Sequence, residues 1–130
     1  MKILYIEDND QMAFLVCTLL KAHGYEVEHV ALGKPGLERF YEAYPSWDAV
    51  ILDLALPDVS GRDLLPEMAA QRPNLPIVVY SGMNGPRFGL DSRFELFSTG
   101  ASAVLWKPSG GQKLLDVLQE LIGAPPKPSA

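Results

Sequence analysis

Four short apolar runs, each ending abruptly at a polar residue, constrain the fold of this chain more than any other feature. The runs are residues 3–6, 49–52, 77–80 and 103–106, and the residues that follow them are Glu7 and Asp8, Asp53, Ser81, and Lys107. Short apolar runs bounded by turn-forming residues are typical of parallel strands that are buried on both faces. Because the carboxyl ends of parallel strands meet at one edge of a sheet, where ligands bind, we expect these polar side chains to converge. Three carboxylates, a hydroxyl and an ammonium at one place indicate a site for a divalent cation and a phosphoryl group.

Length and composition limit the class of protein. With 130 residues, 48% of them apolar, the chain is large enough for one domain with a core and too short for two. No run approaches the roughly 20 apolar residues that cross a bilayer, and the N-terminus lacks a signal peptide, so we expect a cytoplasmic protein without a membrane partner. The net charge of −5 argues against direct binding of nucleic acid by this domain. A single cysteine, Cys17, excludes an internal disulfide and is predicted to be a buried structural thiol. His23 and His29 have no partner at metal-ligand spacing and are expected at the surface.

Segments with the helical spacing of apolar residues alternate with the apolar runs. The first helix is predicted to follow an N-cap at Asp10 and to end at Gly24, with a core-facing side made of Met12, Leu15, Leu19 and Ala22. Residues 25–30 alternate between polar and apolar, which is typical of a strand at the edge of a sheet. A second helix is expected to start near Pro35. Because Pro66 is tolerated in a first helical turn, we place the start of the third helix at Asp63 or Leu64.

The last third of the chain contains two candidate capping boxes. One, at Ser92–Glu95, predicts a fourth helix of about two turns that ends at Gly100. The other, at Ser109–Gln112, predicts the start of the last helix. Residues 82–89 are rich in turn formers and are not expected to be helical.

Five strands alternating with five helices predict an α/β fold, a flavodoxin-like, doubly wound (βα)5 sandwich with a parallel five-stranded sheet in the order 2-1-3-4-5. That order sends the alternating segment 25–30 to an edge. It places Asp53 between the Glu7–Asp8 pair and Ser81, with Lys107 one strand further.

The chain resembles the receiver domains of bacterial two-component response regulators, the CheY-like group. The resemblance rests on residues 6–8, 53–61, 80–82, 100–101 and 107–108, each at the end of the appropriate strand. It implies a receiver domain over residues 1–123, followed by a Pro-rich tail or the start of a linker at 124–130. It also implies a signalling module that catalyses only its own phosphorylation and dephosphorylation, not an enzyme with a separate substrate.

By this resemblance, Asp53 is the residue that accepts a phosphoryl group from a sensor histidine kinase or a histidine phosphotransfer protein. Mg²⁺ is the implied cofactor. Asp8 would be a direct ligand, Glu7 would act largely through water, and Asp53 and the backbone carbonyl of Ala55 would complete the protein ligands. Lys107 and Ser81 suit the neutralisation and hydrogen bonding of phosphoryl oxygens.

The resemblance also implies a route from the phosphoryl group to an output surface formed by the fourth helix, the fifth strand and the fifth helix. Ser81 is the implied switch residue, but the swinging aromatic expected three residues before the lysine is replaced by Val104, which has few rotamers. Trp106, two residues after Val104, should face the same side of the strand as Val104. It is a candidate anchor for an unknown downstream protein, or else a packing residue beneath the fourth helix. We also expect the long segment 82–99 to contribute to partner specificity, and we consider a phosphorylation-dependent homodimer.

Two other functions fit part of the pattern. A phosphatase similar to the haloacid dehalogenase group would use an aspartyl nucleophile but needs a second Asp two residues later, where this chain has Ala55. A receiver-like scaffold that is never phosphorylated agrees with Val104, whereas the acid pair, Asp53, Ser81 and Lys107 count against it. The chain has no Gly-x-x-x-x-Gly-Lys-Ser/Thr motif, which argues against a P-loop nucleotide hydrolase.

Overall fold

The computed structural model describes residues 1–43, 46–82, 90–107 and 110–125. Within these ranges, five strands alternate with five helices. The strands are β1 (Lys2–Ile6), β2 (Glu26–Val30), β3 (Ala49–Leu52), β4 (Ile77–Ser81) and β5 (Ala103–Trp106). The helices are α1 (Asp10–Ala22), α2 (Gly33–Glu42), α3 (Gly61–Gln71), α4 (Leu90–Ser98) and α5 (Gly110–Ile122).

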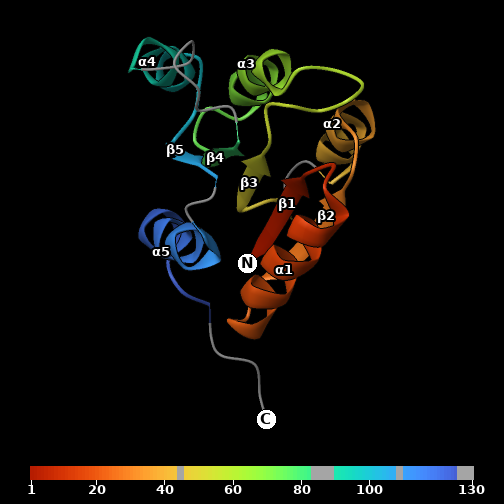
Figure 1. Ribbon diagram of the computed structural model, residues 1–130, viewed down its shortest axis with the longest axis vertical. Coiled ribbons are helices and arrows are strands. Elements are labelled where there is room, and N and C mark those ends of the chain that lie inside the picture. Colours follow the sequence, from red (N-terminus) through yellow and green to blue (C-terminus); the bar gives the residue numbers. More distant parts are fainter. Residues whose placement is uncertain (44–45, 83–89, 108–109, 126–130) are drawn as a thin grey trace.

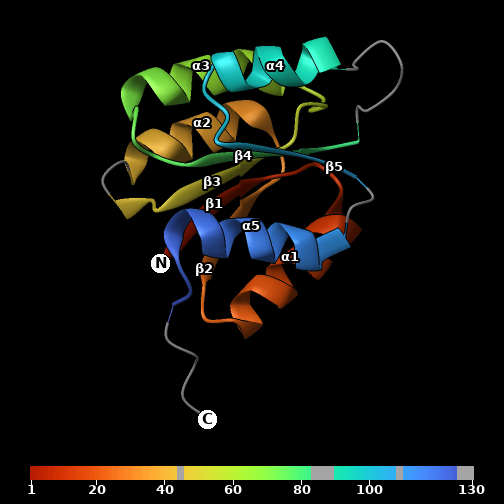
Figure 2. The same cartoon turned by 90° about the vertical axis from the view of Figure 1, so that its left-hand side faces the viewer.

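The strands form a parallel sheet in the order β2-β1-β3-β4-β5, which confirms the predicted doubly wound α/β fold and its strand order. Helices α1 and α5 cover one face of the sheet, and α2, α3 and α4 cover the other (Figure 1 and Figure 2). Strand β2 is only partly buried, as expected for the edge position of its alternating sequence.

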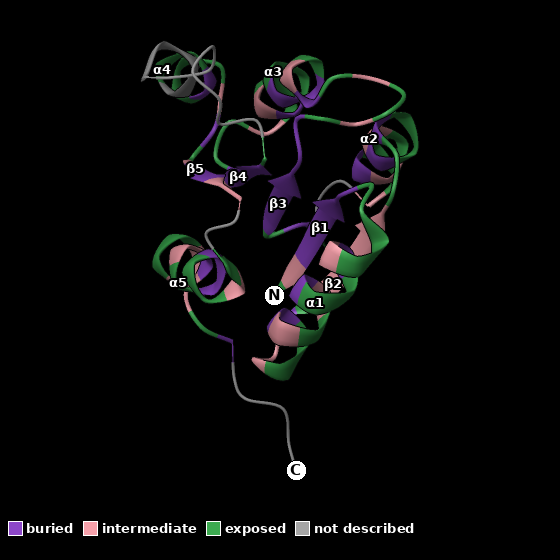
Figure 3. Cartoon of the chain, in the orientation of Figure 1, coloured by how far each residue is buried: buried purple, intermediate pink, exposed green. Residues whose placement is uncertain are grey.

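A separate hydrophobic core fills the space on each side of the sheet. On β1, Leu4 and Ile6 belong to the core beneath α2, α3 and α4, whereas Ile3 and Tyr5 belong to the core beneath α1 and α5. Figure 3 shows β1, β3 and β4 almost entirely buried between the two helical layers. This explains why those strands read as continuous apolar runs and not as alternating ones.

The side of helix α1 that faces the core agrees only in part with the predicted one: Met12 and Leu19 pack against the core, whereas Leu15 and Ala22 are exposed. Its N-cap is Asn9, not Asp10, because the Asn9 side chain accepts a hydrogen bond from the Met12 backbone N–H at 2.9 Å. The buried residues are Ala13, Val16 and Leu20. Leu15, expected in the core, is 64% exposed, and Phe14 is 70% exposed. The sequence of α1 is apolar on several sides, and the side carrying the small residues Ala13 and Val16 is the one that lies against the sheet.

Two further helix starts differ from the prediction. Helix α3 begins at Gly61, after an N-cap at Ser60, so the predicted start at Asp63 or Leu64 was wrong. Pro66 therefore lies within the helix, at an exposed position. Helix α4 begins at Leu90, before the Ser92 that the capping-box pattern indicated.

Helix α2 begins at Gly33, before Pro35, and it is capped from a distant part of the chain. The Asp58 carboxylate accepts the backbone N–H groups of Gly33 and Lys34, each at 2.8 Å. These bonds lower the pKa of Asp58, because N–H donors favour the ionised carboxylate. The loop between β3 and α3 is therefore tied to the start of α2.

Some expectations fall on residues that the structure leaves undescribed. These are most of the turn-rich segment 82–89, the capping residue Ser109 and residues 126–130 of the predicted tail. Among the described residues, no helix combines the length and apolar character needed to cross a membrane. Cys17 is half-buried, less than predicted, and burial raises the pKa of its thiol.

The close approach of α3 to the end of β3 makes Gly61 a sensitive position. A Cβ atom on Gly61 would lie 2.3 Å from the Asp53 carbonyl oxygen and 2.7 Å from the Leu54 Cα. We expect Gly61→Ala to lower the free energy of unfolding by about 2–3 kcal/mol, because backbone would have to shift to admit one methyl group. Gly82→Ala is the matched control, since a Cβ there meets none of the described residues within 4 Å. Urea unfolding of both variants measures the difference, and equal stabilities would contradict the close-approach argument.

Candidate functional site

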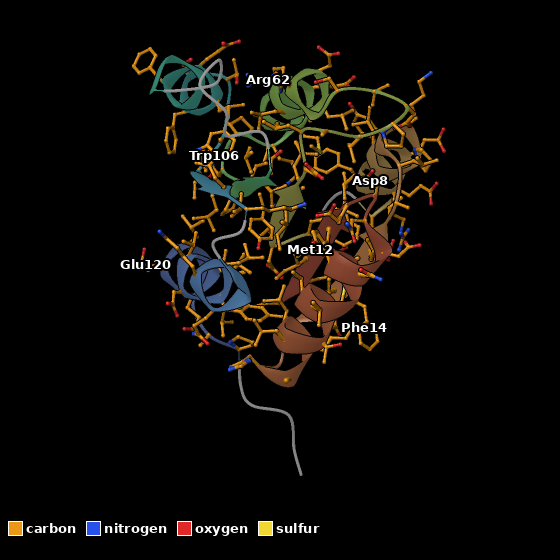
Figure 4. The ribbon with its side chains drawn as sticks, in the orientation of Figure 1. Asp8, Met12, Phe14, Arg62, Trp106 and Glu120 are labelled. Carbon is orange, nitrogen blue, oxygen red and sulfur yellow. The ribbon has the colours of Figure 1, made fainter. Side chains whose placement is uncertain are left out.

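The polar residues that follow the strands lie together at the carboxyl edge of the sheet, as the sequence predicted. Carboxylate oxygens of Glu7, Asp8 and Asp53 all lie within 4.8 Å of one another. Asp8 follows β1 at the start of α1, where Figure 4 labels it. Backbone hydrogen bonds hold the strand ends in register, from the Asp53 N–H to the Ile6 carbonyl at 3.1 Å and from the Lys107 N–H to the Ser81 carbonyl at 2.8 Å.

The three carboxylates differ sharply in their exposure to water. Glu7 is fully buried and Asp53 is 4% exposed, whereas Asp8 is exposed. A cation such as Mg²⁺ prefers oxygen ligands and keeps several waters. These residues could hold such an ion, with Asp8 on the side that is open to solvent.

Both oxygens of the Asp53 carboxylate have hydrogen-bond donors. Oδ1 accepts from the Ser81 hydroxyl at 3.0 Å and from the Ala55 backbone N–H at 3.1 Å. Oδ2 lies 3.4 Å from the Lys107 ammonium. The Ser81 side chain is thus already turned toward Asp53. The bond from Ala55 fixes the segment after β3 beside the carboxylate, while the ligand role of the Ala55 carbonyl stays a prediction.

Lys107 lies between two carboxylates and is closer to Glu7. Its Nζ is 2.5 Å from Glu7 Oε1, compared with 3.4 Å from Asp53. Burial alone would lower the pKa of Lys107, but the hydrogen bond to Glu7 and the charge of Asp53 outweigh it and raise that pKa. Burial raises the pKa of Glu7, and the bond from Lys107 only partly offsets this. With Asp8 close to these two carboxylates, three acidic groups and one ammonium leave a surplus of negative charge that a divalent cation would offset.

Three residues of this site were not predicted. The Tyr5 hydroxyl donates to Glu7 Oε1 at 3.3 Å, and the Asn9 backbone N–H donates to Glu7 Oε2 at 3.3 Å. His29, expected at the surface, is half-buried with its Nε2 2.6 Å from the Glu7 carbonyl oxygen. The spacing could have indicated Tyr5, because residues two apart on a strand face the same side. The position of His29 depends on the register of β2 against β1, which the sequence did not specify.

The two candidate output residues lie on β5, beside the end of β4. Val104 is buried, while Trp106 is partly exposed and packs against the core beneath α2, α3 and α4. In the strand register Trp106 is paired with Ser81. Figure 4 shows Trp106 on β5, on the side of the molecule where α4 lies. On β5, Trp106 is therefore the aromatic residue paired with Ser81, and Val104 is a core residue.

Exposed apolar side chains lie on two of the helices that border this edge of the sheet. On α1 they are Phe14 and Leu15, and on α4 they are Phe94 and Phe97. An apolar groove of about 340 Å³ runs between α1 and the start of α5, lined by Met12, Leu15, Val16, Leu19, Tyr80 and residues 110–112. Exposed apolar side chains beside an apolar groove, as on α1, are typical of sites where other proteins bind.

Comparison with known proteins gives consistent matches. The profile of the response regulator receiver domain matches residues 3–119. The cell cycle transcriptional regulator CtrA of Caulobacter vibrioides is 33% identical over 110 residues, which are 83% of this chain and 44% of that protein. The transcriptional regulatory protein QseB of Escherichia coli O157:H7 is 36% identical over 108 residues, 83% of this chain and 47% of that protein. The chain thus spans about half the length of the curated relatives it matches.

A solved structure shares the fold and part of the sequence. The crystal structure of a response regulator receiver domain protein from Clostridium thermocellum superposes on this chain with a TM-score of 0.83 and 30% identity. The superposition covers 93% of each chain. It therefore includes the sheet and both helical layers.

The buried pair of Glu7 and Lys107 makes stability depend on pH in a defined direction. Lys107→Met should lower the free energy of unfolding of the metal-free protein by about 3–5 kcal/mol at neutral pH, because it leaves a buried carboxylate without its ammonium. Without Lys107, the pKa of Glu7 in the folded state lies further above its pKa in the unfolded state. The folded variant therefore binds more protons than the unfolded variant as pH falls, and the loss of stability becomes smaller. Urea unfolding in EDTA at about pH 5 and about pH 8 measures the difference in the free energy of unfolding between the variant and the native chain at each pH.

The double variant Glu7→Gln with Lys107→Met is the matched control. It removes both charges, and we expect it to recover most of the lost stability and to lose the extra pH dependence. A loss of the same size at both pH values in Lys107→Met would contradict the role given to the ion pair.

Proposed function

Since this chain belongs to the response regulator receiver domain family, we propose that it is a phosphorylation-controlled signalling module in which Asp53 accepts the phosphoryl group. The observation that carries this proposal is the environment of Asp53: a nearly buried carboxylate with donors on both oxygens, beside two further carboxylates and an ammonium. Such a carboxylate is oriented for attack on phosphorus and surrounded by groups that can stabilise added negative charge.

In the proposed reaction an oxygen of Asp53 forms a bond to phosphorus while the bond from phosphorus to the donor breaks. With a phosphohistidine donor, the electron pair of the P–N bond stays on the imidazole, which takes a proton from water. The product is an aspartyl phosphate, a known type of covalent intermediate. Hydrolysis of that acyl phosphate by water returns the carboxylate and inorganic phosphate.

Mg²⁺ is the proposed cofactor, because it prefers oxygen ligands such as these carboxylates and keeps several of its waters. The exposed Asp8 leaves room for those waters. Asp8 and Asp53 would hold it directly, with Glu7 through water and the Ala55 carbonyl as a backbone ligand. The chemistry that Mg²⁺ supplies when bound is neutralisation of charge on the phosphoryl oxygens. Lys107 contributes a second positive charge, and the Ser81 hydroxyl contributes a hydrogen bond to the same oxygens.

A protein that carries a phosphohistidine is the proposed donor, either a sensor histidine kinase or a histidine phosphotransfer protein. The exposed side chains of Phe14 and Leu15 on α1, and the apolar groove beside them, support a protein donor over a small molecule. Both side chains lie on α1, the helix that begins two residues after Asp8, the exposed carboxylate of the site.

The proposed output surface is formed by α4, β5 and α5. Phosphorylation adds charge and three acceptor oxygens beside Ser81, and Ser81 is paired with Trp106 in the sheet. Trp106, together with the exposed Phe94 and Phe97 on α4, gives this surface aromatic side chains suited to a downstream protein or to a second copy of the chain. Val104 is too stiff and too deeply buried to act as a swinging gate.

Intact-protein mass after incubation with Mg²⁺ and acetyl phosphate tests the proposed function. We expect the native chain to gain one phosphoryl group, and to gain none when EDTA replaces Mg²⁺. Asp53→Asn should gain none under any condition, because an amide is a poor nucleophile with no charge to bind the cation.

Asp10→Asn is a suitable control, because Asp10 is an exposed carboxylate in the first turn of α1 that lies outside the acid cluster. It should be phosphorylated like the native chain. A native chain that stays unmodified with acetyl phosphate and with a panel of phosphorylated histidine kinases would overturn the proposal in favour of a scaffold that is not phosphorylated.

A further inference from the structure

Tyr5 belongs to the acid site although it lies within β1 and not at its end. Its side chain is fully buried, and its hydroxyl donates to Glu7 Oε1 at 3.3 Å. The Lys107 ammonium donates to the same oxygen at 2.5 Å. Glu7 Oε1 is therefore shared between one charged and one neutral donor.

The sheet holds the Tyr5 ring in this place. In the register of β1 and β2, Tyr5 is paired with His29, and the centroids of the two rings are 5.7 Å apart. His29 in turn contacts the Glu7 carbonyl oxygen through Nε2 at 2.6 Å. Because Tyr5 and His29 both contact Glu7, the hydroxyl is fixed beside the carboxylate before any phosphoryl group arrives.

Lys107 has competing demands on its ammonium. It lies 2.5 Å from Glu7 and 3.4 Å from Asp53, and it lies 5.5 Å from the centre of the Tyr80 ring. A phosphoryl group on Asp53 would draw the ammonium toward the new oxygens and away from Glu7. Glu7 is fully buried, so the loss of its nearest donor is costly unless another donor remains.

We propose that Tyr5 is a positioning residue for phosphorylation of Asp53: its hydroxyl stabilises the Glu7 carboxylate and so releases Lys107 to the phosphoryl oxygens. This inference rests on the proposed function. With acetyl phosphate as donor, an Asp53 oxygen bonds to phosphorus, the P–O bond of the donor breaks, and acetate leaves with the electron pair. Tyr5 touches none of these atoms and exchanges no proton with them; it acts through Glu7 on the position of Lys107.

The test is a double-mutant cycle on the rate of phosphorylation by acetyl phosphate at saturating Mg²⁺. Tyr5→Phe removes the hydroxyl and keeps the ring, and we expect it to slow phosphorylation roughly tenfold, the effect of losing a hydrogen bond to a charged group. In a Lys107→Met background the same change should have almost no further effect, because there is no ammonium left to release. A merely structural loss would slow both backgrounds by the same factor.

Tyr25→Phe is the matched control. Tyr25 is also a buried tyrosine, and its hydroxyl donates to the Gly123 carbonyl at 2.8 Å, away from the acid site. It should lose stability without a change in the phosphorylation rate. A Tyr5→Phe rate equal to the native or Tyr25→Phe rate, or equal slowing with and without Lys107, would overturn the proposal.

A second cycle examines the hydrogen bond in the metal-free protein, without any phosphorylation. Tyr5→Phe should lower Tm in EDTA by roughly 4 °C in the native background and by about half as much with Glu7→Gln, whose amide accepts a weaker hydrogen bond. Equal drops in both backgrounds would overturn the link between Tyr5 and the Glu7 charge. Because this cycle needs no phosphorylation, it separates the two failures: a native chain that accepts no phosphoryl group counts against the proposed function, and equal Tm drops count against the Tyr5–Glu7 bond on which this inference depends.

Discussion

Two carboxylates buried around one ammonium form the constraint on which the rest of the site depends. Glu7 and Asp53 are almost completely removed from water, and Lys107 is near enough to serve both. Charges buried in this way are tolerated only when paired and hydrogen-bonded. The remaining donors follow from this requirement: Ser81 and the Ala55 N–H for Asp53, and Tyr5 and the Asn9 N–H for Glu7. The surplus negative charge makes the unliganded site receptive to a cation.

The difference between Glu7 and Asp8 shows how two adjacent carboxylates take different roles. Successive residues at the end of β1 point in different directions, so Glu7 enters the interior beside Tyr5 whereas Asp8 stays in contact with water. The buried member interacts with Lys107, and the exposed one is available to an ion that arrives with its hydration shell. One acidic pair can thereby organise the interior of the site and its entrance.

The sequence allowed the fold and the membership of the site to be predicted because both follow from strand ends. Apolar runs located the central strands, and parallel topology brought Glu7, Asp8, Asp53, Ser81 and Lys107 to one edge. Helix orientation was harder, because α1 is apolar on more than one side and the choice between Leu15 and Val16 depends on how closely the helix approaches the sheet. The start of α3 depends on a close backbone contact at Gly61, and the place of His29 depends on strand register. These are tertiary properties, for which short patterns carry little information.

The capping of α2 by Asp58 has a consequence for how sequences of this kind can diverge. Two segments that are 25 residues apart in the sequence are joined by a hydrogen bond, in which the Gly33 backbone N–H donates to the Asp58 carboxylate. Gly33 has little freedom of its own, because a Cβ there would lie 2.4 Å from the Val59 side chain, the residue next to Asp58. Among homologues, positions 33 and 59 should therefore change together, because a larger residue at one leaves less space at the other, whereas position 58 only has to keep an acceptor for the backbone N–H groups.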